Sequence, residues 1–269
     1  MKHELVDGLE LPRIGFGTWG IGGTSSPDRA SDKKSLAALR SALDLGYRHF
    51  DTAEMYAAGH AEELLGQAIR EAAVQREQVF LTSKALPEHL RYADLLRACE
   101  RSLHRLRVDY LDLYLIHWPN PDIPLADSFR ALNQLVEEGR VRRIGVSNFD
   151  LDLLEEARQL AATPIFTNQA PFSLRDRSYA QNGVLQYCQD NGILLTAYTP
   201  FEAGGLQIHA NLASIARTHA ATPHQIALAW LLAQPRVITI PMSHDPGHQQ
   251  ENLAAADIEL SLAEMTQLN

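Results

Sequence analysis

The sequence predicts an α/β fold, a single (β/α)8 TIM barrel over residues 1–269, with an N-terminal β-hairpin and extra helices near the C-terminus. Short apolar segments alternate with amphipathic helical segments at a spacing of roughly thirty residues, as in parallel βα units. Eight such units can be counted along the chain. A chain of 269 residues that is 45% hydrophobic can bury the core of one such barrel.

An N-terminal hairpin precedes the first βα unit. Lys2–Val6 and Leu9–Leu11 flank Asp7-Gly8, which is the strongest short-range signal for a tight two-residue turn, and Pro12 then closes the hairpin. The strand candidates follow, and several are nearly continuous apolar runs, as expected for strands buried on both faces. They are Ile14–Gly17, His49–Asp51, Val79–Ser83, Leu111–His117, Arg143–Ser147, Ile165–Gln169, Leu194–Tyr198 and Val237–Ile240.

Helical segments lie between these strands. Thr222-Pro223 is a favourable helix start, because threonine caps free amide groups and proline fits the first turn. Asn211–His219 is expected to form an extra helix before that point, and Ser261–Asn269 a closing eighth helix. The other helical candidates are Ser31–Leu45, Ala61–Arg70, Tyr92–Leu106, Ala126–Glu138, Leu151–Leu160, Gly183–Asp190 and His224–Ala233.

Composition and charge argue against several classes of function. A formal net charge of −9 provides no basic stripe for nucleic acid or an anionic membrane. No run reaches the roughly eighteen apolar residues of a membrane helix, and the N-terminus lacks a signal-peptide core. Cys99 and Cys188 have no metal-ligand spacing and are typical of thiols in a reducing compartment. We therefore expect a cytoplasmic monomer whose partner is a small molecule.

Polar side chains stand where most of the predicted strands end. The chemistry of such a barrel lies at the carboxyl ends of its strands, so these side chains are expected to meet. A set with Asp, Lys, His, Ser, Asn, Gln and Tyr is more polar than core packing requires. The strand ends are Gly17-Thr18-Trp19, Asp51, Ser83-Lys84, His117-Trp118, Ser147-Asn148, Gln169, Tyr198 and Pro241-Met242-Ser243.

Four residues near this rim have acid-base capacity and suggest proton transfer. Tyr56 could donate a proton near neutral pH if a cation favoured its phenolate form, because the ordinary pKa of tyrosine is about 10. Lys84 can supply that charge, and Asp51 would keep Lys84 protonated and in place. His117 would donate a hydrogen bond to the substrate oxygen. Taken singly, each residue also has a structural explanation: Asp51 as a helix cap, Tyr56 as a packed ring, Lys84 as a solvated charge and His117 as a half-buried imidazole.

A metal site is the other common use of histidine and aspartate at a barrel rim. His49 and Asp51 would project from the same strand face. However, the sequence offers no second histidine or carboxylate pair at a spacing that would complete a coordination sphere. We therefore expect no metal.

A series of segments resembles motifs of the aldo-keto reductase family, in the family's order and over nearly the whole chain. They are Gly15-Phe16-Gly17-Thr18-Trp19, Asp51-Thr52-Ala53-Glu54-Met55-Tyr56, Leu81-Thr82-Ser83-Lys84, Leu115-Ile116-His117-Trp118-Pro119, Gly145-Val146-Ser147-Asn148-Phe149, Asn168-Gln169 and Ala197-Tyr198-Thr199-Pro200. The resemblance assigns the family's catalytic tetrad to Asp51, Tyr56, Lys84 and His117. It implies NAD(P)H-dependent reduction of an aldehyde or ketone to an alcohol by hydride transfer, with Tyr56 as the general acid.

The resemblance also implies the cofactor contacts. The family binds an extended nicotinamide dinucleotide, NADPH or NADH, without the Gly-x-Gly-x-x-Gly motif, and no such motif follows a strand here. By this likeness Ser147, Asn148 and Gln169 would hold the nicotinamide amide, and Tyr198 would stack on its ring. Further implied contacts are Thr18, Trp19, Asp51, Thr199, Pro200, Ser243, His248 and Asn252.

The expected substrate wall is apolar and aromatic. Trp19 and Trp118 follow the first and fourth strands and would line the space above the nicotinamide with Met55, beside Tyr56 and His117. The alternative for the tryptophans is ordinary barrel packing. Such a wall fits aldehydes and ketones in general and identifies no single substrate.

Three features depart from the family pattern. Ala57-Ala58-Gly59 follows Tyr56 where bacterial members usually have a glycine, which is expected to stiffen this loop. The short tail that ends at Asn269 suggests an open pocket and broad specificity. Met242 and His248 stand where many members carry a lysine and an arginine, so weak discrimination between NADPH and NADH is expected. His248 could bind a phosphate as a cation only when protonated, so preference for NADPH should grow as pH falls.

Two alternatives remain open from the sequence. A lysine or arginine from elsewhere in the chain could serve the ribose 2′-phosphate, because such loops vary readily. The barrel could also be a non-catalytic dinucleotide-binding sensor or a channel-associated subunit. The intact tetrad argues against a purely binding role.

Overall fold

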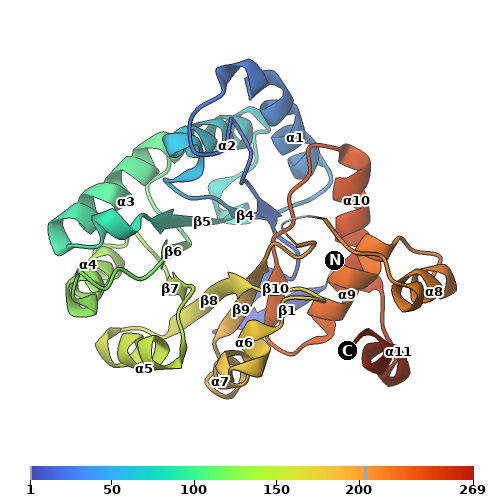
Figure 1. The fold of residues 1–269 in the computed structure, drawn as a ribbon. Helices are drawn as coiled ribbons and strands as arrows, with labels where there is room; N and C mark the ends of the chain where they lie inside the picture. The colour runs from blue at the N-terminus through green and yellow to red at the C-terminus, as the bar shows by residue number, and fades with distance from the viewer. Residues whose placement is uncertain (1, 203–204) are drawn as a thin grey trace.

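Eight parallel strands form the centre of the protein (Figure 1), as the computed structural model describes it for residues 2–202 and 205–269. Each strand pairs with the next one along the chain. The first and last strands are joined by a parallel bridge between Ile14 and Thr239, where the backbone N–H of Gly15 donates to the carbonyl of Thr239 over 2.8 Å. The predicted barrel is therefore confirmed. Its strands are β3 Phe16–Gly17, β4 His49–Asp51, β5 Phe80–Ala85, β6 Leu113–Ile116, β7 Ile144–Ser147, β8 Ile165–Pro171, β9 Leu194–Tyr198 and β10 Val237–Thr239.

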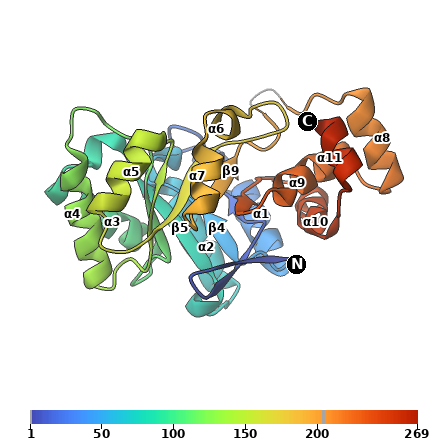
Figure 2. The same cartoon turned by 90° about the horizontal axis from the view of Figure 1, so that it is seen from below.

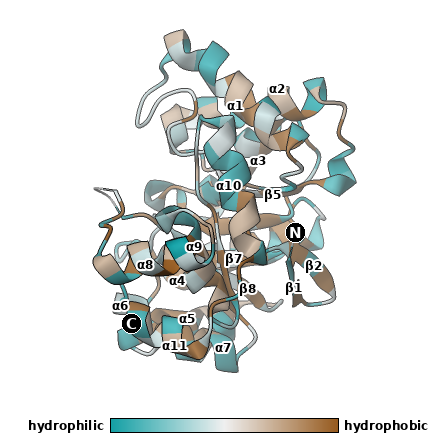
Figure 3. Cartoon of the chain, turned by 90° about the vertical axis from the view of Figure 1, so that its right-hand side faces the viewer, coloured by the Kyte–Doolittle hydropathy of each residue, from teal (hydrophilic) through white to brown (hydrophobic). Residues whose placement is uncertain are grey.

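Helices surround the strands (Figure 1), and the strands carry much of the hydrophobic colour in Figure 3. The structure confirms every predicted strand and helix to within two residues at each end. It adds two helices that the sequence patterns did not predict, α6 and α10. The helices are α1 Asp32–Asp44, α2 His60–Glu71, α3 Tyr92–Leu106, α4 Leu125–Glu137, α5 Leu151–Leu160, α6 Ser178–Gln181, α7 Val184–Asp190, α8 Ala210–Thr218, α9 Pro223–Ala233, α10 Pro246–Ala254 and α11 Leu262–Leu268.

The N-terminal hairpin lies at one end of the barrel, opposite α6 (Figure 2). Its strands, β1 His3–Val6 and β2 Leu9–Pro12, are antiparallel. The two turn residues have φ angles of 49° and 74°, the left-handed values that a type I′ turn requires. Val6 and Leu11 pack with Phe80 and Phe166 in one buried cluster, so the hairpin covers the end of the barrel away from the polar strand ends.

The prediction that Ser261–Asn269 closes the barrel as its eighth helix is wrong. The segment does form α11, but α11 packs against α8. The helix after β10 is α10, which packs against α1 and α9. It therefore lies beside the junction where the first and last strands meet. The sequence does carry a start signal for α10, because the side chain of Asp245 accepts from the N–H groups of Gly247 and His248 and a proline follows it.

One glycine in α2 allows this helix to approach α3 closely. A Cβ atom on Gly66 would lie 2.3 Å from the carbonyl oxygen of Leu106 and 2.9 Å from its Cα. We expect Gly66→Ala to lower the free energy of unfolding by about 1–3 kcal/mol, because backbone atoms must move to make room. Gln67→Ala is the matched control in the next position, with an expected change within about 0.5 kcal/mol. Urea denaturation measures both, and equal stabilities would contradict this packing.

Candidate active site

Three adjacent strands bring the predicted tetrad together at the polar rim of the barrel. Asp51 ends β4, Lys84 lies within β5, and His117 directly follows β6. The parallel register places Asp51 opposite Thr82 and Lys84 opposite Leu115, so the three side chains occupy neighbouring positions. Tyr56 reaches the same place from the loop after β4.

The Lys84 ammonium group is fully buried and uses all three of its hydrogens. It forms an ion pair with Asp51, donates to the carbonyl of Thr52 over 2.9 Å and donates to the Tyr56 hydroxyl oxygen over 3.2 Å. The Lys84 side chain is 0% exposed and that of Asp51 is 1% exposed. The solvated-charge explanation for Lys84 and the helix-cap explanation for Asp51 are therefore wrong.

The electrostatics of this cluster favour a charged lysine and a protonated tyrosine. Burial opposes the charge of Lys84, but Asp51 and Tyr56 together raise its pKa above the ordinary value. Burial raises the pKa of Tyr56. Lys84 lowers that pKa, as the sequence predicted, but by less than burial raises it. Tyr56 therefore carries its proton at neutral pH. Because Lys84 donates to the Tyr56 oxygen, the hydroxyl hydrogen is left to point elsewhere.

His117 is a neutral imidazole in this site. Burial, followed by the charge of Lys84, lowers the pKa of His117 to about 2. Among the described residues its Nδ1 atom is buried and has no hydrogen-bond partner, which leaves Nε2 as the nitrogen that faces the cavity. Its ring lies 5.7 Å from that of Tyr56, centroid to centroid, and stacks on Trp118 at 3.9 Å. A carbonyl oxygen near Tyr56 would therefore be within reach of His117 as well.

A chain of hydrogen bonds connects the tetrad to the residues assigned to the nicotinamide. The side-chain NH₂ of Gln169 donates to the second oxygen of Asp51 over 2.8 Å, which fixes the orientation of that amide. The Asn148 side chain donates to the hydroxyl of Ser147 and accepts from the hydroxyl of Tyr198 over 2.8 Å. The side-chain carbonyl oxygen of Gln169 is thus left as an available acceptor.

These residues line one cavity of about 450 Å³ at the carboxyl ends of the strands. Trp19 is 47% exposed and meets the Tyr56 ring edge to face at 5.2 Å, so neither it nor Trp118 serves only to pack the barrel. Several lining residues had no predicted role, and nothing in their spacing along the chain distinguishes them. Those are Gly17, Phe201, Glu202, Ile240 and Pro241. The predicted residues in the lining are Thr18, Trp19, Asp51, Met55, Tyr56, His117, Trp118, Ser147, Asn148, Gln169, Tyr198, Thr199 and Pro200.

The loop after Tyr56 has an unusual backbone. Ala57 and Ala58 have φ angles of 50° and 52°, and Gly59 follows with 90°, so three successive residues are left-handed. This conformation costs roughly 1–2 kcal/mol for each alanine. It is maintained by contacts outside the loop, including the N–H of Ala57, which donates to the carbonyl of Thr24. The loop that was expected to be stiffer therefore has a backbone conformation that alanine rarely adopts.

The three predicted contacts of the adenosine end lie elsewhere, in a cavity of about 460 Å³ beside α10. Ser243, His248 and Asn252 all line it. This cavity shares Phe201 and Met242 with the cavity of the tetrad. The two cavities are thus neighbours, arranged as the two ends of an extended ligand would require.

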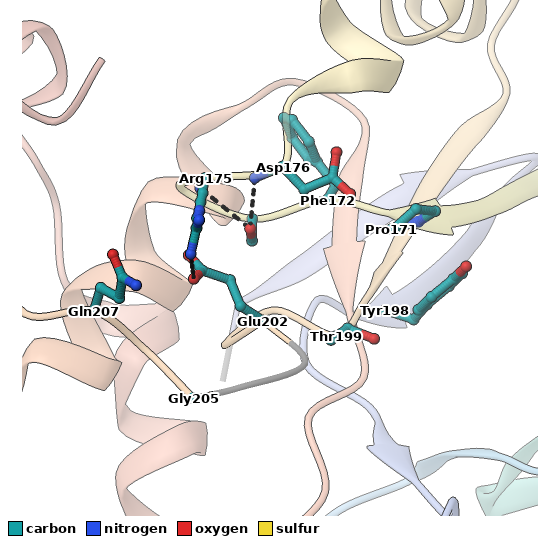
Figure 4. A pocket seen from close by; sticks show the side chains of 10 residues that line it. Pro171, Phe172, Arg175, Asp176, Tyr198, Thr199, Glu202, Gly205 and Gln207 are labelled. Atoms are coloured by element: carbon teal, nitrogen blue, oxygen red, sulfur yellow. Dashed lines mark hydrogen bonds and ion pairs between the residues drawn. The ribbon is translucent and has the colours of Figure 1, made fainter.

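A third and wider crevice of about 680 Å³ adjoins the tetrad cavity (Figure 4). It shares Tyr198, Thr199 and Glu202 with that cavity. Arg175 and Glu202 face each other there, with a closest nitrogen-to-oxygen distance of 3.9 Å. The crevice therefore has charged side chains as well as the aromatic rings of Phe172 and Tyr198 in its lining.

Two further observations concern metals and membranes. Within residues 2–202 and 205–269, no group of three or more His, Cys, Asp or Glu side chains is arranged to hold a metal ion. Over the same residues, every helix is too short or too polar to cross a membrane.

Comparison with known proteins gives a consistent result. The model of the Aldo/keto reductase family matches residues 13–269. Methylglyoxal reductase YeaE of Escherichia coli is 38% identical and is aligned over 97% of this chain and 91% of its own length. Glyoxal reductase of Bacillus subtilis is 37% identical over 99% of this chain and 91% of its own.

Solved structures are equally similar. The thermostable aldo-keto reductase Tm1743, solved with the inhibitor epalrestat, superposes with a TM-score of 0.96 at 46% identity, over 100% of this chain and 98% of its own. An aldo-keto reductase from Klebsiella pneumoniae in complex with NADPH superposes with a TM-score of 0.88 at 40% identity, over 100% of this chain and 94% of its own. The family match, the relatives and the buried tetrad at the barrel rim agree, and this chain belongs to the aldo-keto reductase family.

Proposed function

We propose that this protein, acting as a single catalytic domain over residues 1–269, reduces aldehydes and ketones to alcohols with a reduced nicotinamide dinucleotide. The observation that carries the proposal is the hydrogen bond from buried Lys84 to the Tyr56 oxygen, with Asp51 behind Lys84. This arrangement leaves the Tyr56 proton available to a substrate oxygen and stabilises the phenolate that forms when the proton leaves. A protein that only bound a dinucleotide would not need this buried charge.

The reaction requires a hydride at the carbonyl carbon and a proton at the carbonyl oxygen. When bound, the cofactor supplies a hydride to the carbonyl carbon of the substrate. Tyr56 donates its proton to the carbonyl oxygen, and His117 holds that oxygen through a neutral N–H. Asp51 keeps Lys84 charged and in place, so that the positive charge is already present when negative charge develops on Tyr56.

The residues around the tetrad fit a nicotinamide carboxamide. The NH₂ group of Gln169 donates to Asp51, so Gln169 offers its side-chain carbonyl oxygen as an acceptor. Ser147 and Asn148 provide further polar atoms at the same rim. Tyr198 completes this side of the cavity. The neighbouring cavity beside α10 gives room for the adenosine half of a dinucleotide.

Small 2-oxoaldehydes are the substrates to test first. Two relatives at 37–38% identity are named as methylglyoxal and glyoxal reductases. Trp19, Met55 and Trp118 give the substrate side of the cavity an apolar surface, which would accept many aldehydes and ketones. A panel of aldehydes monitored by cofactor absorbance at 340 nm tests the activity. Cofactor binding without turnover of any carbonyl would contradict the proposal and favour a sensor.

Tyr56→Phe removes the proposed proton donor and little else. We expect turnover to fall by at least about a hundredfold, the typical contribution of a positioned general acid, while the dissociation constant of the cofactor stays nearly unchanged. Steady-state kinetics and fluorescence titration measure the two quantities. Residual activity within a few-fold of the parent would rule out Tyr56 as the acid.

Lys84→Met tests the coupling between the lysine and the tyrosine. Lys84 lowers the pKa of Tyr56, so its loss should raise that pKa and move the basic limb of the carbonyl-reduction profile upward or out of range. Turnover should fall more than substrate affinity. Because an unpaired Asp51 is costly when buried, thermal melting must first show that the variant is folded. An unchanged basic limb in the folded variant would mean that Lys84 does not act on Tyr56.

A further inference from the structure

The cavity beside α10 is poor in positive charge. Among the described residues that line it, Glu251 is the only one with a permanent charge, and the others are apolar, neutral polar or histidine. Burial, followed by the charge of Lys34, lowers the pKa of the adjacent His244, so that imidazole is neutral at pH 7. Met242 and Ser243 complete the side that faces the tetrad cavity. A ligand in this cavity thus meets a carboxylate and no fixed cation in its lining.

The N-terminus of α10 is also closed to an anion. The Asp245 carboxylate accepts from the N–H of Gly247 over 2.7 Å and from the N–H of His248 over 3.2 Å. These are the amide groups that a helix would otherwise offer to a phosphate. Asp245 therefore occupies the donors and adds a second negative charge beside His248, which lines the cavity.

We propose that this cavity binds the adenosine ribose as an uncharged 2′,3′-diol and selects NADH over NADPH. The inference rests on the proposed function, because it assumes that the ligand is a nicotinamide dinucleotide. A ribose hydroxyl donates readily to a carboxylate such as Glu251, as acidic residues do in other NAD sites. A 2′-phosphate carries nearly two negative charges and would face Glu251 and Asp245 without a charge-assisted partner.

The expected selectivity exceeds the weak discrimination that the sequence alone suggested. One charge-assisted hydrogen bond to a phosphate is worth roughly ten- to a hundredfold in affinity, and here repulsion replaces it. An alternative is that Lys34 of α1, the cation whose charge acts on His244, binds the 2′-phosphate. If Lys34 reached the phosphate, NADPH would be favoured instead.

The test is the dissociation constant of each cofactor for the intact protein at pH 8, followed by quenching of tryptophan fluorescence. Trp19 lines the tetrad cavity and is half exposed, so its fluorescence reports cofactor binding directly and no turnover is needed. We expect NADH to bind about tenfold or more tightly than NADPH. Equal affinities, or tighter binding of NADPH, would overturn the selectivity. Binding of neither cofactor would instead overturn the proposed function.

Single substitutions locate the effect. Asp245→Asn removes the charge and keeps a good helix cap, and Glu251→Gln removes the charge from the lining. Each should tighten NADPH binding several-fold. Asp245→Asn should leave NADH binding within about fourfold of the parent value, whereas Glu251→Gln should weaken it, because the Glu251 carboxylate is the proposed acceptor for the ribose diol. Asp150→Asn is the matched control, because Asp150 caps α5 in the same way on another side of the barrel, and it should leave the ratio unchanged. A tenfold loss of NADPH affinity in Lys34→Met would assign the phosphate to Lys34 and overturn the proposal.

Discussion

The buried ion pair between Lys84 and Asp51 is the interaction on which the active site depends. Two charges taken out of water cost several kcal/mol each unless their remaining hydrogen-bonding groups are satisfied. The barrel meets this requirement with Thr52 and Tyr56 for the lysine and Gln169 for the aspartate. The hydrogen bond to Tyr56 and the orientation of Gln169 are thus both consequences of keeping one ion pair satisfied in the protein interior.

The barrel supplies the geometry that this pair requires. In a parallel sheet the strands end at the same edge, so side chains from β4, β5 and β8 converge without any loop having to fold around them. Tyr56 is the exception, because it lies on a loop. That loop holds two left-handed alanines, and its strained backbone is tolerated where the position of the tyrosine matters most.

Sequence patterns predicted the strands and the convergence of the four tetrad side chains, because both depend on order along the chain. Apolar runs mark buried strands, and Asp51, Lys84 and His117 stand at strand ends that topology alone brings together. The role of α10 was not predicted, because the start signal at Asp245-Pro246 does not show where the helix packs. Its place beside α1 and α9 exists only once the first and last strands have met. The net pKa of Tyr56 also could not be predicted, because burial outweighs Lys84 and burial is a property of the folded barrel.

The charges at the tetrad and the charge of Asp245 at α10 lie in different electrostatic environments. At the tetrad, charges are buried and paired, so removing one partner leaves the other uncompensated and changes the chemistry. At α10, Asp245 is exposed, and its carboxylate accepts from two backbone amides of its own helix turn. A charge there can change without disturbing the barrel core. If the cofactor binds as we propose, substitutions at α10 can alter cofactor preference while Tyr56 and the Lys84–Asp51 ion pair remain unchanged.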